Sequence, residues 1–251
     1  MKFSIPGAIP RAALITGGAQ QLGIANALAD AGFAVALQCH SGIDADDTPD
    51  LPFVVNVAAP CHSEIEAFLP SHAVLLPADL SDETQTASLL GRATAALGPI
   101  GVLVNGASTV GRDAWDDATR ATWDMHIETN LRAPFLLIQH FARALPAQCE
   151  GVVINLLDQR ICPQLVSYTL SKAALWTLTQ TMALALAPLI RVNGIVRGGN
   201  VPVRPVRDQG VRHPDSGTSP EDIGRAALAI LALSSMTGQM IDPDGIPPPA
   251  A

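Results

Sequence analysis

Tyr168 and Lys172 are the residues of this chain whose types and spacing most directly suggest chemistry. Tyr168 is the only tyrosine, and it stands four positions before Lys172. That spacing places the two side chains on one helix face, one turn apart. The positive charge of an ammonium group favours a phenolate, so we expect Lys172 to lower the pKa of Tyr168. Such a pair suits general acid catalysis on a carbonyl or imine, although ordinary surface neighbours have the same spacing.

Strand and helix patterns alternate along the chain around this pair. Apolar runs predict strands at residues 11–16, 33–39, 73–77, 101–105, 151–157, 190–196 and 239–241. Helical patterns predict helices at residues 20–31, 62–69, 82–97, 119–145, 165–187 and 219–234. This alternation is typical of an α/β protein with one doubly wound, parallel, Rossmann-type sheet and helices on both faces. We expect residues 1–251 to form a single domain with an irregular insertion at 41–60.

A glycine-rich turn joins the first predicted strand to the first predicted helix. Glycines there let the backbone bend tightly and approach a pyrophosphate, whose charge then meets the helix N-terminus. The position of the turn favours a dinucleotide site over an ordinary glycine turn. We expect Gly23 to let the helix pack close to the sheet. The candidate cofactor residues of this turn are Thr16, Gly17, Gln21, Leu22 and Gly23.

The end of the second predicted strand indicates which dinucleotide binds. An acidic residue there would bind the ribose hydroxyls of NAD and repel the 2′-phosphate of NADP. The segment after Gln38 contains no carboxylate before Asp44. The sequence therefore favours NADP over NAD, with His40 and Ser41 as phosphate contacts. The preference is modest because no arginine stands in this strand end.

The composition excludes several classes of partner. The chain has 251 residues and a net charge of −8, without a basic patch dense enough for nucleic acid. No apolar run is long enough to span a membrane. The four cysteines lack the spacing of metal ligands, so we predict no metal site. We expect reduced thiols in a cytoplasmic protein that acts on a small molecule.

Taken in order, these motifs resemble the short-chain dehydrogenase/reductase family over nearly the whole chain. Residues 16–23 look like its cofactor turn, and Tyr168 and Lys172 match its catalytic tyrosine and lysine. Asp79 and Leu80 are similar to the family segment that meets the adenine ring. Asn105, Ala107 and Ser108 are similar to the segment after the fourth strand of the family, and Asn130 matches a helix asparagine of the family.

The resemblance implies a role for each of these residues. Tyr168 would donate a proton to the substrate while the nicotinamide delivers hydride, and Lys172 would hold the nicotinamide ribose. Asn130 would support a proton-relay water, unless it is only a helix-kink asparagine bonded to backbone. Asp79 would contact the adenine ring, unless it caps helix 82–97. The resemblance also implies a homotetramer or homodimer packed through helices 119–145 and 165–187.

Asp158 stands where the family has a catalytic serine. An aspartate there resembles the pteridine reductase branch, including bacterial dihydromonapterin reductases. A carboxyl group beside Tyr168 could orient the phenol or pass a proton, provided that burial raises the pKa of Asp158. The alternative is a loop aspartate that caps local backbone. Ser108, Asp158 and Tyr168 are the candidate substrate contacts.

Three features depart from the family pattern. The aromatic residue that stacks on the pterin is absent after Ser108, unless Trp115 replaces it. Arg197 replaces the proline of the Pro-Gly turn beside the nicotinamide, which leaves Gly198 as the contact there. The usual Asp-Gly-Gly ending is broken at Gly245. We expect residues 197–218 to form the loop that covers the substrate.

The leading interpretation is an NADP-dependent reductase of a C=O or C=N bond, with a dihydropterin as the favoured substrate. A 3-oxoacyl or alcohol-type reductase of the same family is one alternative. A non-catalytic dinucleotide-binding sensor is another, and the altered turns support it. Because a sensor needs no proton donor, the presence of Tyr168, Lys172 and Asn130 favours an enzyme.

Overall fold

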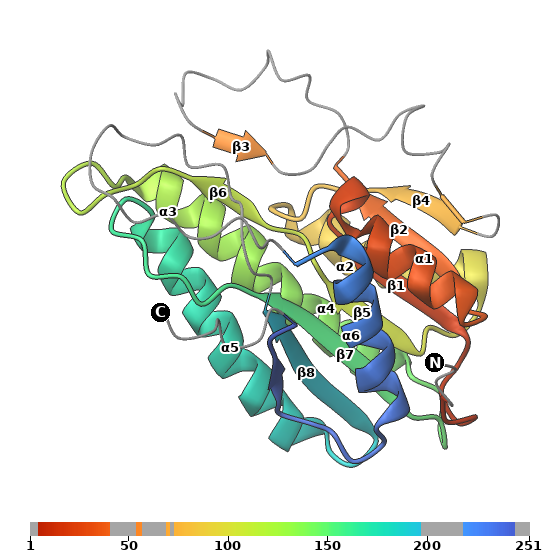
Figure 1. Cartoon of the computed structure of the whole chain (residues 1–251). Coiled ribbons are helices and arrows are strands. Elements are labelled where there is room, and N and C mark those ends of the chain that lie inside the picture. Colours follow the sequence, from red (N-terminus) through yellow and green to blue (C-terminus); the bar gives the residue numbers. More distant parts are fainter. Residues whose placement is uncertain (1–4, 41–53, 57–68, 71–72, 197–217, 244–251) are drawn as a thin grey trace, which may run out of the picture.

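A computed structural model describes residues 5–40, 54–56, 69–70, 73–196 and 218–243 (Figure 1). Its main sheet has seven strands in the order β4-β2-β1-β5-β7-β8-β9, and every neighbouring pair is parallel. The strands are β1 Ala12–Thr16, β2 Ala34–Cys39, β4 Ala73–Pro77, β5 Val102–Asn105, β7 Gly151–Leu157, β8 Ile190–Val196 and β9 Met240–Ile241. Central strands read as continuous apolar runs because helices cover both faces. The predicted fold class is confirmed.

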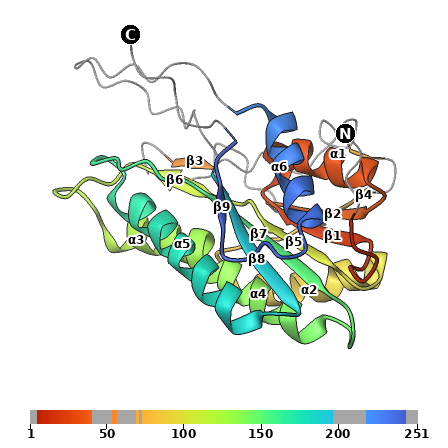
Figure 2. The same cartoon turned by 60° about the horizontal axis from the view of Figure 1, so that its bottom comes forward.

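The helices form two layers, one on each face of the sheet (Figures 1 and 2). Helices α1 and α6 cover one face, and α2, α4 and α5 cover the other. The helices are α1 Leu22–Asp30, α2 Glu83–Leu97, α3 Arg120–Ile127, α4 Ala133–Ala144, α5 Val166–Leu186 and α6 Pro220–Ala232. A short 3₁₀ helix, η1 Gly18–Gln21, leads into α1. None of the helices in the described part of the chain combines the length and the apolar character that a membrane span needs.

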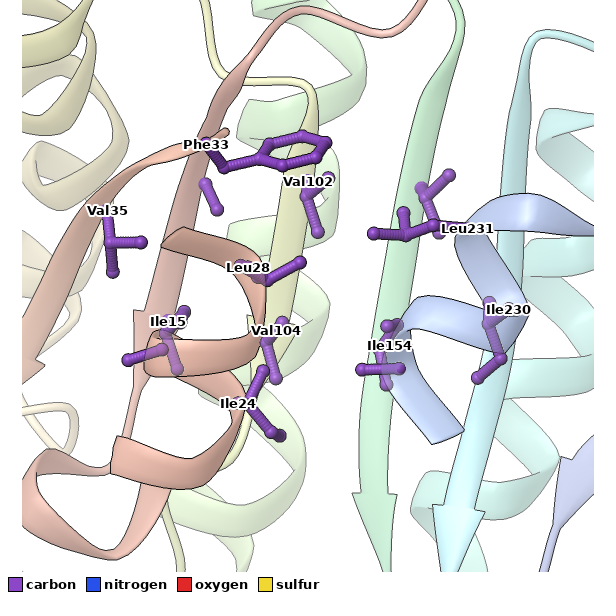
Figure 3. Close-up of a cluster of buried hydrophobic side chains, with 14 of the residues drawn as sticks. Ile15, Ile24, Leu28, Phe33, Val35, Val102, Val104, Ile154, Ile230 and Leu231 are labelled. Carbon is purple, nitrogen blue, oxygen red and sulfur yellow. The ribbon is translucent and has the colours of Figure 1, made fainter. Parts of the chain in front are cut away.

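The core beneath α1 and α6 shows how the layers are held together (Figure 3). Ile15 and Val104 point from β1 and β5 toward Leu28 of α1, while Ile154 of β7 meets Ile230 of α6. All five side chains are fully buried. Burying an aliphatic side chain of this size contributes about 1.5–3 kcal/mol relative to leaving it exposed. This core therefore fixes where the carboxyl ends of the strands meet.

Gly23 allows a close contact between two helices. A Cβ atom at Gly23 would lie 2.2 Å from the carbonyl oxygen of Pro220, at the start of α6. Gly224 is the counterpart on α6, since its Cβ would lie 2.7 Å from the carbonyl oxygen of Gly23. The prediction that Gly23 serves helix-to-sheet packing is thus wrong, because the close approach is between α1 and α6.

The predicted helix 119–145 is interrupted. It consists of α3, a π-helical turn η3 Glu128–Arg132, and α4. Asn130 lies in the π-helical turn, where its side chain bonds to residues outside the helix. Such turns are common at functional sites. The helical pattern of the sequence gave no sign of this break.

The predicted insertion 41–60 is not wholly irregular. A short strand, β3 Val54–Asn56, pairs antiparallel with β6 Thr109–Gly111. The rest of the insertion lies outside the described residues, as do residues 62–68 of the predicted short helix and residues 197–217 of the predicted substrate loop. Cys149 and Cys162 are free thiols, whereas Cys39 is disulfide-bonded. The expectation of reduced cysteines is therefore wrong for Cys39.

Candidate active site

The candidate residues gather at the carboxyl edge of the sheet, where the strand order changes direction. From β1 the chain proceeds to β2 and β4 on one side, and from β5 it proceeds to β7 and β8 on the other. Thr16 and Asn105 end the two central strands and are partners in the ladder. In open α/β sheets, ligands bind outside the carboxyl ends of the strands at this point.

The turn after β1 is held against the segment after β5. The hydroxyl of Thr16 accepts hydrogen bonds from the backbone N–H groups of Gly106 and Ala107, at 3.1 and 3.2 Å. Gly17 has a φ of 113°, and a Cβ atom there would lie 2.8 Å from the backbone of Gly106. Both the backbone conformation and the close approach therefore require glycine at position 17.

Two buried glutamines fix the same turn. The Gln21 amide donates to the carbonyl of Gly106 at 3.1 Å, so its side chain joins two loops. Gln38, which the sequence did not single out as a site residue, accepts from the backbone N–H of Gly17 at 3.0 Å. Its amide also donates to the carbonyl of Ala78 at 2.8 Å. The predicted cofactor turn is thus braced by side chains from α1's leading turn and from β2.

Three buried polar atoms lack a hydrogen-bond partner among the described residues. They are Nε2 of His40, Oδ1 of Asn105 and Oγ of Ser108, of which the last also lies close enough to Tyr168 to lower the pKa of its phenol. A buried polar group without a partner costs roughly 1–3 kcal/mol, so each of them calls for a ligand group or ordered water. His40 follows β2, and Asn105 and Ser108 follow β5, which is the predicted course of the dinucleotide and substrate. The residues present therefore fit the cofactor that the sequence implies.

The other candidate cofactor residues occupy different kinds of position in the fold. Asp79 follows β4, and its carboxylate accepts hydrogen bonds from the N–H and hydroxyl of Ser81. It does not cap α2, since that role belongs to Asp82. Leu80 is buried in the core, and Leu22 packs against the core at the start of α1. Ser41 and Gly198 lie outside the described residues.

The structure brings Tyr168 and Asp158 into direct contact. The Tyr168 hydroxyl donates to Oδ2 of Asp158 at 2.9 Å. The guanidinium of Arg160 donates to both oxygens of the same carboxylate, with the shortest contact at 2.5 Å. The Asp158 side chain is 7% exposed and that of Arg160 is 37% exposed. Tyr168, Asp158 and Arg160 thus form one hydrogen-bonded unit at the end of β7.

The electrostatics of this unit bear on two expectations. Burial alone would raise the pKa of Asp158, but the hydrogen bonds and charge of Arg160 outweigh it, so the pKa lies below its usual value. Burial, and then the charge of Asp158, raise the pKa of Tyr168 well above its usual value. The predicted fall in the pKa of Tyr168 is wrong, and the raised pKa that proton transfer from Asp158 would require is not found. Burial is the largest cause of the raised pKa of Tyr168, and the Asp158 carboxylate that accepts its hydrogen bond raises the pKa further.

Lys172 and Asn130 also lie near Tyr168. The Lys172 ammonium is buried, donates to the carbonyl of Leu156 at 3.3 Å, and lies 5.9 Å from the centre of the Tyr168 ring. The Asn130 side chain exchanges hydrogen bonds with the backbone of Thr109 and donates to Ser171, whose hydroxyl donates to the Tyr168 carbonyl. These hydrogen bonds agree with the alternative role of a helix asparagine bonded to backbone, and the proton-relay role stays a prediction.

Sequence reasoning missed some of these neighbours. Arg160 was not singled out, although a buried carboxylate needs a cation and Arg160 stands two positions after Asp158. Trp115 is 87% exposed and is not among the apolar side chains that pack around Tyr168. Among the residues that the structure describes, no cluster of three or more His, Cys, Asp or Glu side chains could hold a metal ion.

Known proteins share this architecture. The chain matches FolM alternative dihydrofolate reductase 1 from Brucella canis, solved in complex with NADP, with 33% identity, a TM-score of 0.74, and coverage of 93% of this chain and 92% of that one. It is 27% identical to gluconate 5-dehydrogenase from Gluconobacter oxydans over 78% of this chain and 72% of that protein.

Other curated relatives match over a shorter segment. L-xylulose reductase from Bos taurus is 35% identical over 47% of this chain and 48% of its own length. The chain spans about half the length of the first curated relatives that it matches, 50% and 48%. The model of the family described as short chain dehydrogenase matches residues 11–202. The chain therefore belongs to the short-chain dehydrogenase family.

Proposed function

We propose that the protein is an NADP-dependent reductase of a C=O or C=N bond, that Tyr168 is its proton donor, and that a dihydropterin is its substrate. The observation that carries the proposal is the hydrogen bond from the Tyr168 hydroxyl to Asp158, beside Lys172 and at the carboxyl edge of the sheet. It supplies a general acid next to the predicted nicotinamide site.

The protonation state of Tyr168 supports reduction. Because burial and Asp158 raise its pKa, the phenol keeps its proton at neutral pH. When bound, the nicotinamide supplies the hydride that becomes the new C–H bond. Tyr168 transfers its O–H proton to the substrate oxygen or nitrogen, which becomes neutral, and is left as a phenolate. Its proton must then come from solvent before the next turnover.

Asp158 orients the phenol rather than supplying a proton. Arg160 keeps the Asp158 carboxylate ionised, so this carboxylate can only accept a hydrogen bond. The carboxylate therefore holds the Tyr168 hydroxyl in one direction. Ser108, whose buried hydroxyl lies close enough to Tyr168 to lower the pKa of the phenol, is the proposed substrate contact on the neighbouring segment.

The choice of NADP is supported by the end of β2. The described residues there carry no carboxylate, and the Nε2 atom of His40 is buried without a partner among them. A 2′-phosphate next to His40 would meet a hydrogen-bonding group and no repelling charge. The similarity to a FolM protein solved with NADP favours the same cofactor.

The relatives suggest two substrate classes. The FolM similarity covers nearly the whole chain and supports a dihydropterin or dihydrofolate. The similarities to L-xylulose reductase and gluconate 5-dehydrogenase support a sugar or polyol carbonyl, which is the second candidate. Asp158 in place of the family serine favours the first candidate, because it departs from the alcohol-type pattern.

We further propose that residues 1–251 form one dinucleotide-binding domain in a cytoplasmic homodimer or homotetramer. One sheet runs from β1 near the start of the chain to β9 near its end, which supports a single domain. Sedimentation equilibrium of the purified chain measures the oligomeric state. A concentration-independent monomer mass would contradict the proposed assembly.

The first test is cofactor binding followed by turnover. NADPH and NADH are titrated into the purified protein, with nicotinamide fluorescence as the signal. NADPH oxidation is then measured with a dihydropterin, dihydrofolate and L-xylulose. Tighter NADPH binding and pterin-dependent oxidation are expected. Turnover of L-xylulose alone would favour the second candidate, and the absence of binding by either cofactor would favour the non-catalytic sensor.

A further inference from the structure

Three buried polar side chains lie close to Tyr168 and have no part in the proposed chemistry. They are Asp113, His126 and Ser167, and each is 0% exposed. Asp113 follows β6, His126 lies in α3, and Ser167 lies in the first turn of α5. Full burial of a carboxylate and an imidazole is costly unless their hydrogen bonds are complete. The burial of this cluster therefore needs a structural or functional explanation.

The hydrogen bonds run in one direction through the cluster. Nε2 of His126 accepts from the backbone N–H of Gly111 at 2.8 Å, so this nitrogen carries no proton. The proton of the neutral ring is then on Nδ1, which lies 2.5 Å from the Ser167 hydroxyl oxygen and donates to it. The Ser167 hydroxyl in turn donates to Oδ2 of Asp113. Each side chain of the cluster is thus held by a hydrogen bond to the next one.

Asp113 also holds the start of α5. The backbone N–H of Ser167 lies 3.2 Å from each carboxylate oxygen of Asp113. The N-cap residue of α5, Leu165, provides no side-chain cap of its own. A carboxylate at a helix N-terminus is favoured by the unpaired N–H groups and by the helix dipole. Asp113 therefore takes the place of the missing cap from a distant segment.

The cluster lies directly against Tyr168. Ser167 immediately precedes Tyr168, and the His126 ring meets the Tyr168 ring edge-on, with the ring centres 6.0 Å apart. The arrangement is not a hydrolytic triad. In such a triad the serine gives its proton to histidine, whereas here the serine gives it to a carboxylate and is shielded from solvent.

We propose that Asp113, His126 and Ser167 are positioning residues that hold Tyr168 in the geometry required for proton transfer. The inference rests on the proposed role of Tyr168 as proton donor. Small displacements of a catalytic group are costly, since a misplacement of about 1 Å can reduce a rate by roughly 10²-fold. The cluster restrains the Tyr168 backbone from one side, while Asp158 restrains its hydroxyl from the other.

A matched pair of variants at His126 tests the proposal. In His126→Asn the amide nitrogen lies near the position of Nδ1 and can still donate to Ser167. In His126→Gln the amide lies near Nε2 and the donor to Ser167 is lost. We expect His126→Gln to lower kcat by roughly 10- to 100-fold and His126→Asn by about 3-fold or less, with unchanged NADPH affinity in both.

A second readout does not depend on turnover. Because Tyr168 is the only tyrosine, tyrosine labelled with ¹³C at Cζ alone gives a single ring resonance in NMR spectra. This resonance should move and broaden in His126→Gln and stay near its wild-type position in His126→Asn. If His126→Gln does not fold, Ser167→Ala replaces it, because it removes the same link with little change in volume. The expected loss of kcat and shift of the resonance are the same.

A control separates positioning from general loss of stability. Phe141→Leu truncates a buried side chain beside Gly151, at the amino end of β7. It should lower stability but leave kcat and the tyrosine resonance unchanged. Equal kcat values for His126→Asn and His126→Gln, or an unmoved resonance in His126→Gln, would overturn the positioning role. Full activity of Tyr168→Phe would instead overturn the proposed function, whatever the His126 variants do.

Discussion

A carboxylate and an ammonium group both lie near Tyr168, and their distances indicate which of the two has the larger effect on the pKa of its phenol. Its hydroxyl lies 2.9 Å from Asp158, whereas the Lys172 ammonium is 5.9 Å from the centre of its ring. Coulomb energies fall with distance, and the carboxylate also accepts the phenol proton directly. Burial is the largest cause of the raised pKa of Tyr168, and Asp158 raises it further, so the residue keeps the proton that the proposed reduction would consume.

Replacing Tyr168 by phenylalanine removes only the hydroxyl. Asp158 keeps its bonds to Arg160, so the site should stay intact. We expect kcat to fall by roughly 10²–10⁴-fold, the usual contribution of a general acid, while NADPH affinity is unchanged. Steady-state kinetics and a fluorescence titration of the same sample measure the two quantities. A variant with wild-type kcat would eliminate Tyr168 as the proton donor.

The Asp158→Asn substitution should change the ionisation of the same tyrosine. Burial is the largest cause of the raised pKa of Tyr168; the charge of Asp158 and its hydrogen bond raise it further, and the charge of Arg160 lowers it. Removing the carboxylate leaves Arg160 unopposed, so the pKa of Tyr168 should fall and phenolate should form at lower pH. An NMR titration of the single labelled tyrosine follows this directly. Asp124→Asn, on an exposed face of α3, is the matched control. An identical titration in Asp158→Asn would show that burial alone sets the pKa.

At the scale of the elements, the contact between α1 and α6 depends on the absence of a side chain at both Gly23 and Gly224. The Gly23→Ala substitution would place a Cβ atom 2.2 Å from the Pro220 carbonyl oxygen, so the helices must separate. Overpacking of this kind typically costs about 1–3 kcal/mol. Gly91→Ala in α2 is the control, since nothing lies within 4 Å of its Cβ. The control should gain about 0.5–1 kcal/mol, and denaturant unfolding measures both. Equal stability of the two variants would contradict this account of the contact.

The order of the elements could be predicted from the sequence because it depends on local patterns. Apolar runs marked the strands of the main sheet, and alternation with helical segments implied parallel pairing. The π-helical turn at Asn130 could not be predicted, because its side chain bonds to Thr109 and Ser171. The pairing of β3 with β6 joins segments far apart in the sequence.

Some features of the candidate site could likewise be predicted from the sequence, and others could not. The Tyr168–Lys172 pair and the glycine turn follow from spacing within one element. The direction of the pKa shifts does not, because it depends on how Arg160 folds back onto Asp158. The cluster of Asp113 with its histidine and serine spans three elements, so no local pattern reveals it. The assigned roles of the site residues remain predictions.

At the scale of the whole molecule, the buried histidine links stability to pH. Burial lowers the pKa of His126 below its ordinary value of 6.5, although the charge of Asp113 opposes this. The Tyr168 phenol is the other titratable group that faces the ring. In the unfolded chain His126 would accept a proton near pH 6.5, whereas in the folded protein it accepts one only at lower pH. Acid therefore favours the unfolded chain.

The free energy of unfolding should consequently fall as the pH is lowered from about 7.5 to about 5.5. Asp158 does not contribute in this window, because its pKa lies below 3.8. The His126→Asn variant lacks the titrating ring and should lose much of the slope. The control His140→Asn, in α4, still contains His126 and should keep the slope. Urea unfolding at several pH values measures the effect. If His126→Asn kept the full wild-type slope, a protonated His126 would have to be tolerated in the fold, and its hydrogen bond from Gly111 could not be required.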